Sequence, residues 1–251
     1  MMRERLTSRK NPLLQHIRKL LTSRSYREKN GEYAADGVKL LAEAAKWIPQ
    51  DLRTVLVTEG VEICPLPDHV RLVEIPDDIM AQISPMETPQ GALFTCALPD
   101  REGLKLADRS LILDGIQDPG NLGTILRTAD ALEIPVVLTP GCTDAYNPKT
   151  VRATMGAVFR TKPQWGEPAQ IVELCKGQQI PLYVTALSDR AVDLRDADLR
   201  KAAMVIGSEG RGVGAYFLSH ADRELIIPMN QRCESLNAAI AAAIVMWEMK
   251  R

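Results

Sequence analysis

Apolar positions recur at helical spacing near the start of the chain. Residues 11–31, "NPLLQHIRKLLTSRSYREKNG", carry apolar side chains at helical spacing, which predicts an amphipathic helix that stops at Gly31. These apolar residues are Leu13, Leu14, Ile17, Leu20 and Leu21. A second helix is predicted at 37–47, and apolar runs at 53–60 and 92–98 predict short strands. These elements indicate a small α/β unit.

From residue 111 onward, short apolar runs alternate with helical patterns. The runs that predict strands are "LILDGI", "PVVLT", "PLYVTAL", "AAMVIG" and "ELIIP". Strands separated by helices indicate a mostly parallel sheet that is covered on both faces. The stretch before them, "PDREGLKLADRS", is polar and rich in turn residues. We therefore predict an α/β protein with a first domain at 1–98, a linker at 99–108 and a second domain at 109–251.

The composition indicates a class of protein and the compartment in which it works. The 251 residues are 45% hydrophobic and 25% charged, which is typical of a globular protein with one large or two modest domains. No apolar run reaches the roughly 18 residues that a membrane span needs, and no apolar signal core follows the basic start. The five cysteines are scattered, and the three histidines lack the spacing of metal ligands. We expect a cytoplasmic protein with no metal and no membrane partner.

Charge is distributed unevenly along a chain whose net charge is −1. Nine basic and two acidic residues give residues 1–30 a charge of +7, which leaves −8 for the remainder. A cationic segment on an acidic body favours a nucleic-acid partner, while a charge run alone also fits a solvated helix face. The candidate RNA-binding residues in this segment are Arg9, Lys10, Arg18, Lys19, Arg24 and Arg27.

Three loops rich in Gly, Asn, Ser and charged residues follow predicted strands. They are "QDPGNLG" at 117–123, "GSEGRGVG" at 207–214 and "PMNQRCESLN" at 228–237. Because open α/β sheets bind ligands beyond the carboxyl ends of their strands, these loops predict one shared site. Neither a GxGxxG nor a GxxxxGK(S/T) motif is present, which disfavours a dinucleotide site and excludes a P-loop. On glycine content alone, the second loop could equally be a turn.

The first loop leads into a helix that carries a conspicuous arginine. Asp118 or Asn121 could cap this helix, and Gly123 lies one turn before Arg127. Helical side chains lean toward the N-terminus, so Arg127 is expected to lie back across Gly123, where its guanidinium would suit a phosphate. The alternative is an ordinary surface arginine.

The third loop leads into the last helix, "AAIAAAIVMW". A capping role for Ser235 or Asn237 explains one polar residue of the set that also includes Glu234. The helix itself is nearly all small and apolar, which predicts burial against the sheet or against a second subunit.

Together these loops resemble the three signature motifs of the SpoU family, the TrmH-like RNA 2′-O-ribose methyltransferases. The matching stretches are "DPGNLGTILRTA", "VIGSEGRGV" and "IPM…ESLNAAIAAAI", in the order and spacing of the family. The stretch "NPKTVRATMGAVFR" also matches, and the N-terminal segment from "LTSRKNPLL" to "EKNGEY" resembles the family's ribosomal-protein-like substrate-binding domain. The resemblance therefore covers nearly the whole chain.

This resemblance implies a fold, a cofactor and a set of site residues. The fold would be a SPOUT-like domain with a C-terminal trefoil knot, preceded by an L30e-like domain, in a homodimer with the site at the subunit interface. The cofactor would be S-adenosylmethionine, held by Thr185, Ala186, Leu187, Gly207, Ile227, Met229 and Leu236. The catalytic and substrate positions would be Asn121, Arg127, Glu209, Ser235 and Asn237. The chain departs from the family pattern at Gln231, usually glycine, and at Cys233 and Ala238, usually valine.

The implied reaction is methylation of a ribose 2′-hydroxyl, which makes the substrate RNA. The leading domain favours 23S ribosomal RNA; the alternatives are transfer RNA, an RNA-binding relative without catalysis, and a nucleotide-dependent oxidoreductase that the missing fingerprint disfavours. Because arginine stays protonated, we expect Arg127 to clamp a phosphate and stabilise the developing alkoxide and not to act as a base. We expect Glu209 to hold Arg127 or another donor in place.

Overall fold

The computed structural model describes residues 4–100, 103–230, 232 and 234–251. The chain forms two compact units, each made of two stretches of sequence: Met1–Asp100 with Asp144–Arg160, and Arg101–Thr143 with Thr161–Arg251. Residues 144–160, which follow the domain boundary in sequence, therefore belong to the first unit. The family departures at Gln231 and Cys233 lie outside the described residues.

The first unit is built on a five-stranded mixed sheet with the order β1-β4-β3-β5-β2. β4 pairs in parallel with β1 and β3, whereas β5 pairs antiparallel with β2 and β3. The sequence pattern predicts β3 and β5 but not β1, β2 and β4. β1 and β4 have only two and four residues, too few for alternation to show, and β2 was missed as well. The strands are β1 (Glu4–Arg5), β2 (Glu32–Asp36), β3 (Leu52–Val57), β4 (Arg71–Glu74) and β5 (Ala92–Ala97).

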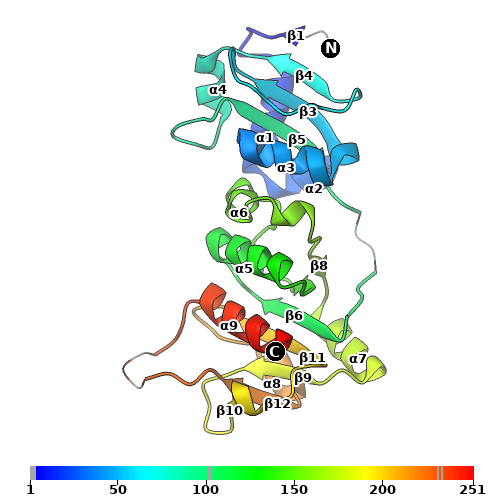
Figure 1. Ribbon diagram of the computed structural model, residues 1–251, viewed down its shortest axis with the longest axis vertical. Helices are drawn as coiled ribbons and strands as arrows, with labels where there is room; N and C mark the ends of the chain where they lie inside the picture. The colour runs from blue at the N-terminus through cyan, green and yellow to red at the C-terminus, as the bar shows by residue number, and fades with distance from the viewer. Residues whose placement is uncertain (1–3, 101–102, 231, 233) are drawn as a thin grey trace. The chain divides into compact units, whose positions relative to one another are not determined.

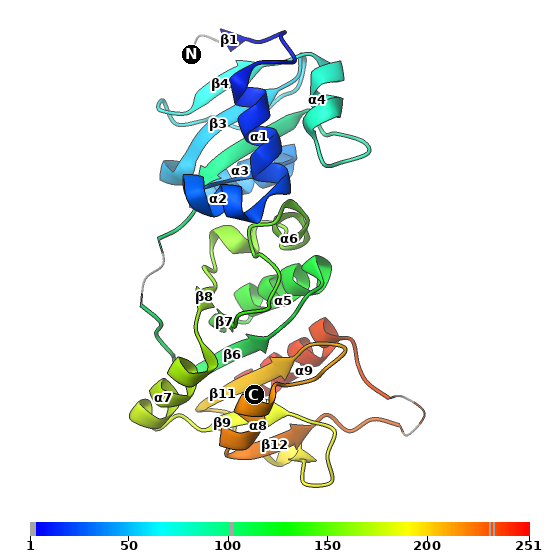
Figure 2. The same ribbon diagram turned by 180° about the vertical axis from the view of Figure 1, so that it is seen from behind.

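Helices cover both faces of this sheet (Figures 1 and 2). α1 (Pro12–Thr22) and α4 (Asp77–Ile83) pack on one face over a core of strand leucines and valines, and α3 (Val38–Trp47) lies on the other. A short turn, η1 (Pro49–Asp51), connects α3 to β3. The second stretch of this unit adds α6 (Pro148–Ala153) and η2 (Ala157–Phe159), which contact β2 and α3 respectively.

Ser23 divides the helix predicted at residues 11–31 into α1 and α2 (Arg24–Asn30). Its backbone is extended, with φ −123° and ψ 116°, and its hydroxyl accepts the Tyr26 N–H at 3.2 Å to cap α2. The prediction of a single helix was wrong because the Ser23 cap starts a new helix, which the apolar pattern of residues 13–21 does not mark. The predicted stop is confirmed, since Gly31 ends α2 with φ 60°.

The second unit is built on a seven-stranded sheet with the order β10-β12-β9-β11-β6-β7-β8. Every neighbouring pair is parallel, which confirms the predicted mostly parallel sheet. The two-residue strands β8 and β10 at its edges have no counterpart in the sequence pattern. The strands are β6 (Arg109–Asp114), β7 (Val136–Leu138), β8 (Gln164–Trp165), β9 (Leu182–Thr185), β10 (Val192–Asp193), β11 (Ala202–Gly207) and β12 (Arg223–Ile226).

Two pairs of helices cover this sheet. α5 (Pro119–Ala131) and α9 (Ala238–Lys250) lie side by side on one face, and α7 (Pro168–Gln178) and α8 (Ala215–His220) pack on the other, while η3 (Leu194–Asp196) follows β10 (Figures 1 and 2). All the strands run the same way, so the loops after β6, β9, β11 and β12 leave from one edge of the sheet.

Candidate functional site

A cavity of about 600 Å³ lies at the carboxyl ends of β9, β11 and β12. Its walls are formed by the chain around 185–190, 206–213 and 224–229, and by the start of α9. Glu209 and Ser235, two of the predicted catalytic residues, line it. So do all seven residues predicted to contact a cofactor: Thr185, Ala186, Leu187, Gly207, Ile227, Met229 and Leu236.

The second loop folds back on itself in a tight turn. Ser208 and Gly212 exchange backbone hydrogen bonds of 3.1 and 2.9 Å, and Gly212 has a φ of 67°. A Cβ atom at Gly207 would lie 2.0 Å from the carbonyl carbon of Gly212. Glycine is therefore required at position 207 by the packing of the loop itself.

Asp114, at the end of β6, ties this loop to the sheet. One of its carboxylate oxygens accepts the Gly214 N–H at 2.7 Å, and the other accepts the Thr139 hydroxyl at 2.9 Å. Asp114 is also the register partner of Gly207 across the β6–β11 pair. The sequence analysis did not single out this residue, although an aspartate that directly follows a buried apolar run at the ligand-binding edge of a sheet is a usable signal.

Three of the predicted catalytic residues form a connected chain of hydrogen bonds. The Asn121 amide donates to Glu209, and its carbonyl oxygen accepts from the Asn237 amide at 3.0 Å. Asn237 also caps α9 by accepting the Ala239 N–H at 2.9 Å. The cap of α5 is Asp118, whose carboxylate accepts the Asn121 N–H at 2.8 Å. The loops before α5, after β11 and before α9 are thus linked side chain to side chain.

Arg127 lies apart from this chain of hydrogen bonds. It is exposed on α5, about 9 Å further along the helix axis than Asn121, given a rise of about 1.5 Å per residue. Arg127 lines a second cavity of about 680 Å³ between α5 and α9, with Ile244 and Trp247 on the opposite wall. The first cavity has none of these residues in its lining. Within one chain, the predicted arginine clamp and the predicted cofactor residues line separate cavities.

Glu224 is a further polar residue of the first cavity that the sequence analysis missed. It lies on β12, inside the sheet, and its side chain is only 10% exposed. Its carboxylate accepts the Ser188 hydroxyl and the Arg190 guanidinium, the latter at 2.6 Å. The available signal was a glutamate within the otherwise apolar strand "ELIIP".

The basic residues predicted to bind RNA fall into two groups in the first unit. Arg9, Lys10, Lys19 and Arg24 are exposed, and Arg18 is half-buried beside Gln82. Arg9 pairs with Asp78, and Arg24 pairs with Glu28 at 3.1 Å. Lys19 lies 5.4 Å from the centre of the Tyr26 ring. Surface ion pairs of this kind contribute little, so they would not keep Arg9 and Arg24 from a phosphate.

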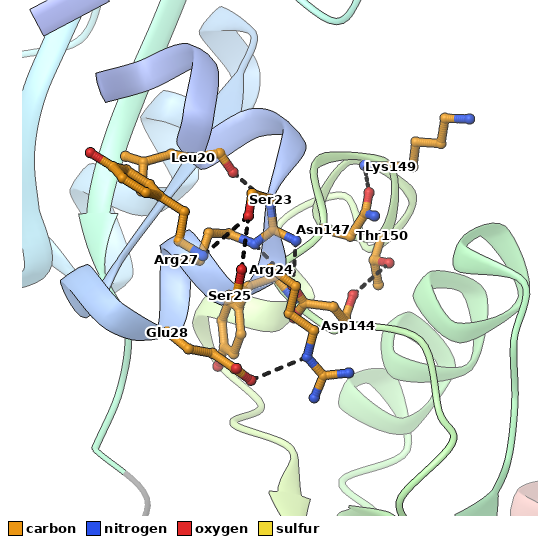
Figure 3. Close-up of polar contacts among 12 residues, drawn as sticks. Leu20, Ser23, Arg24, Ser25, Arg27, Glu28, Asp144, Asn147, Lys149 and Thr150 are labelled. Atoms are coloured by element: carbon orange, nitrogen blue, oxygen red, sulfur yellow. Dashed lines mark hydrogen bonds and ion pairs between the residues drawn. The ribbon is translucent and has the colours of Figure 1, made fainter. Parts of the chain in front are cut away.

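Arg27 is the exception, and its assignment to RNA needs correction. Its side chain is 3% exposed, and its Nε and Nη2 atoms donate to one Asp144 carboxylate oxygen at 2.9 and 2.6 Å (Figure 3). The remaining Nη1 donates to the Leu20 carbonyl at 2.6 Å. All three guanidinium nitrogens therefore donate hydrogen bonds within the fold, where they join the end of α1 to the segment that begins at Asp144.

The described residues offer little to a metal ion. No group of three or more His, Cys, Asp or Glu among residues 4–100, 103–230, 232 and 234–251 could hold one. Burial raises the pKa of the thiols of Cys64, Cys96 and Cys142, and raises that of Cys175 to about 11. At neutral pH these thiols are protonated and are poor ligands and nucleophiles. In the part of the chain that the structure describes, no helix is both long and apolar enough to span a bilayer.

The structure is that of a two-unit α/β protein. One unit is a parallel α/β unit whose strand-end loops converge on one cavity, and it is joined to a smaller mixed α/β unit. The chain belongs to the SpoU rRNA methylase family, whose model matches residues 108–247. The model of the MRM3-like substrate binding domain matches residues 11–93. The predicted enzyme class, an RNA methyltransferase, is confirmed by this membership.

Relatives and solved structures match over almost the full chain. The 23S rRNA (guanosine(2553)-2′-O)-methyltransferase RlmP of Bacillus subtilis is 33% identical over 98% of this chain and 99% of its own length. A putative RNA methyltransferase of the TrmH family from Porphyromonas gingivalis is 33% identical, with a TM-score of 0.84 over 94% of this chain and 96% of that one. An AdoMet-bound rRNA methyltransferase from Sinorhizobium meliloti is 26% identical, with a TM-score of 0.85 over 98% and 97%.

Proposed function

We propose that this chain is an S-adenosylmethionine-dependent RNA 2′-O-ribose methyltransferase that acts on 23S ribosomal RNA. The observation that carries the proposal is the cavity at the sheet edge, which all seven predicted cofactor residues line. The names of relatives favour ribosomal over transfer RNA. Besides RlmP, a 23S rRNA (uridine(2479)-2′-O)-methyltransferase of Streptomyces viridochromogenes is 28% identical over 98% of this chain and 92% of its own.

The residues of the cavity fit this cofactor. A volume of about 600 Å³ lies within the range of roughly 300–1,000 Å³ that is usual for small-molecule sites. Ile206 and Leu236 offer apolar surface for a purine, while Glu209 offers negative charge to a cationic ligand. When bound, S-adenosylmethionine supplies a methyl group on a positively charged sulfur, already activated for transfer.

What the chain itself supplies is alignment. Holding two reactants in line for displacement can be worth roughly 7–11 kcal/mol. Asn121 is held by Glu209 on one side and Asn237 on the other, so its amide has one defined orientation toward the substrate. Glu209 thus acts as the anchor of a donor, and Ser235 offers a hydroxyl at the same cavity. Together these side chains orient the ribose for attack by its 2′-oxygen.

Arg127 is proposed to act across the interface of a homodimer. It lines the cavity between α5 and α9, a face that exposes Ile240 and Trp247, by 52% and 65% of their surfaces. Exposed large apolar side chains on adjoining helices are typical of subunit interfaces. A second copy on this face would let Arg127 of one subunit clamp a phosphate beside the cofactor cavity of the other. Arg127 would stabilise the alkoxide that develops as the 2′-hydroxyl passes its proton to that phosphate or to water.

The first unit is proposed to bind the RNA. Arg9, Lys10, Arg18, Lys19 and Arg24 supply positive charge on the described surface, so affinity should fall steeply as salt is added. The finer fold features implied by the family, an L30e-like first domain at 1–98 and a trefoil knot in the domain at 109–251, are part of the same proposal. So is a cytoplasmic location.

The test is to map ribose methylation across 23S rRNA and tRNA in cells with and without the gene, and in cells that carry an Asn121→Ala variant. One 2′-O-methylated position in 23S rRNA should disappear with the gene and return with the unaltered copy only. Loss of a tRNA position in its place would overturn the proposed substrate, and an unchanged map of both RNAs would overturn the activity.

A further inference from the structure

The chain between β9 and β10 forms one wall of the candidate cofactor cavity. It leaves the sheet at Thr185, and Ala186, Leu187, Ser188 and Arg190 line the cavity. Leu187, which is 64% exposed, is not held by core packing. The shape of this wall, residues 186–190, must therefore depend on hydrogen bonds.

Two points tie the wall to β12. At its start, the Ala186 N–H donates to the Leu225 carbonyl at 3.0 Å. Further along, the Ser188 hydroxyl and the Arg190 guanidinium both donate to the carboxylate of Glu224, the residue before Leu225. The exposed Leu187 thus lies between two anchors on adjacent β12 residues. Leu225 anchors the wall through its backbone carbonyl, and Glu224 anchors it through its side chain.

The two donors to Glu224 do not contribute equally. The Arg190 side chain is 83% exposed, so its ion pair is screened by water and contributes little. Ser188 donates to a carboxylate that is only 10% exposed, and hydrogen bonds to charged acceptors shielded from water are stronger than neutral ones. Each oxygen of the carboxylate already accepts one of these donors, which favours an action on the wall over direct contact with a ligand.

We propose that Glu224 is a positioning residue for cofactor binding: by holding Ser188 and Arg190 it fixes the wall 186–190 against the cavity. The inference rests on the proposed function, because it takes the cavity to be the S-adenosylmethionine site. It assigns a role to a residue that belongs to none of the three family motifs.

The test is calorimetric titration of S-adenosylhomocysteine into the full-length protein and four variants. Glu224→Ala removes both hydrogen bonds and should weaken binding about tenfold, mostly through the loss of the charge-assisted bond from Ser188. Ser188→Ala should weaken it severalfold, and Arg190→Ala by less than about twofold. Asp198→Asn is the matched control, because Asp198 pairs with the exposed Arg200 outside the cavity lining and should leave affinity unchanged.

A second readout follows the wall directly. Trypsin cleaves after arginine, and Arg190 lies in the wall, so Glu224→Ala should speed cleavage there while S-adenosylhomocysteine should slow it. In turnover, the same variant should raise the KM for S-adenosylmethionine with little change in kcat. Unchanged affinity in both Glu224→Ala and Ser188→Ala, with unchanged cleavage, would overturn the inference. Failure of the unaltered protein to bind S-adenosylhomocysteine would instead overturn the proposed function, and this inference with it.

Discussion

Arg27 and Asp144 show how one residue pair can hold together distant parts of the sequence. Both side chains are largely withdrawn from water, with 3% and 14% of their surfaces exposed, and two guanidinium nitrogens donate to one carboxylate oxygen. An ion pair of this kind adds little compared with an apolar pair, but removing one partner leaves a buried charge without compensation. The pair is therefore a point where a single substitution should be costly.

Arg27→Ala should lower the stability of the first unit by about 3–5 kcal/mol. Urea unfolding can be followed through Trp47, which lies in this unit, in a protein whose Trp165 and Trp247 are replaced by phenylalanine. Arg24→Ala is the control, because Arg24 is paired with Glu28 on the same helix but in solvent, and its loss should cost less than about 0.5 kcal/mol. Equal midpoints for the two variants would contradict the argument.

The same residue marks a limit of prediction from sequence. Arg27 and Arg24 are indistinguishable as charges in a basic segment, yet on the same helix Arg27 is buried against Asp144 and Arg24 lies in solvent. The partner of Arg27 lies 117 residues away, beyond the reach of any local pattern. Charge can be counted along a chain, but burial depends on contacts between segments that the pattern does not pair.

At the scale of elements, the loop after β11 is held both by close backbone packing and by a hydrogen bond to a side chain of the sheet. Gly207 and Gly212 pack against each other, and Asp114 holds the far end of the loop through Gly214. The glycine-rich sequence correctly located this loop at the end of a buried strand. It left open whether the glycines serve a turn or a ligand. The structure shows the turn, in which Gly212 has a positive φ and Gly207 closely approaches it, and the same loop also lines the cavity.

Gly207→Ala should therefore disrupt the loop even though alanine is small. The added Cβ would meet backbone atoms of Gly212 and Val213 at 2.0 and 2.2 Å, which only movement of the loop can relieve. We expect S-adenosylhomocysteine affinity to fall by more than about tenfold, measured by calorimetry. Gly177→Ala is the control: no atom lies within 4 Å of its added Cβ, and Gly177 lies on α7 outside the cavity lining, so the affinity of this variant should stay within about twofold. Similar losses of affinity in both variants would contradict the packing argument.

At the scale of the whole molecule, the two units do not simply follow one another along the sequence. Residues 144–160 belong to the first unit, although the second unit begins before them in the sequence. Aromatic contacts support this arrangement, since Tyr146 lies 4.8 Å from Tyr33 and Phe159 lies 6.4 Å from Phe94, measured between ring centres. The alternation of strands and helices predicted a parallel sheet correctly, but no periodicity marks which helix leaves that sheet to pack elsewhere.

A second whole-molecule question is whether the face of α5 and α9 is covered by another copy. Trp247→Glu should convert a dimer into a monomer in light-scattering measurements, because a charge would replace a large apolar side chain, 65% exposed, on the proposed contact face. Trp47→Glu alters another exposed tryptophan, on α3 of the first unit, and should leave the mass unchanged. A monomeric unaltered protein would contradict the proposed dimer.

Arg127 allows a sharper test of the proposed dimer, because the cavity that it lines and the proposed cofactor cavity are separate within one chain. Arg127→Ala should reduce kcat by about 10²–10³, as expected for the loss of a charge that stabilises an oxyanion, while Gly207→Ala should lose cofactor binding. If Arg127 serves the neighbouring subunit, a heterodimer of the two variants contains one complete site, built from the cofactor cavity of the Arg127→Ala chain and the arginine of its partner. Free exchange in an equal mixture makes half of the dimers mixed, so about a quarter of the normal activity should return. Methyl transfer to an RNA substrate would be measured before and after the variants are mixed under conditions that allow exchange. If Arg127 acts within its own chain, every site in the mixture lacks one component, and the activity of the mixture would stay at the level of the separate variants.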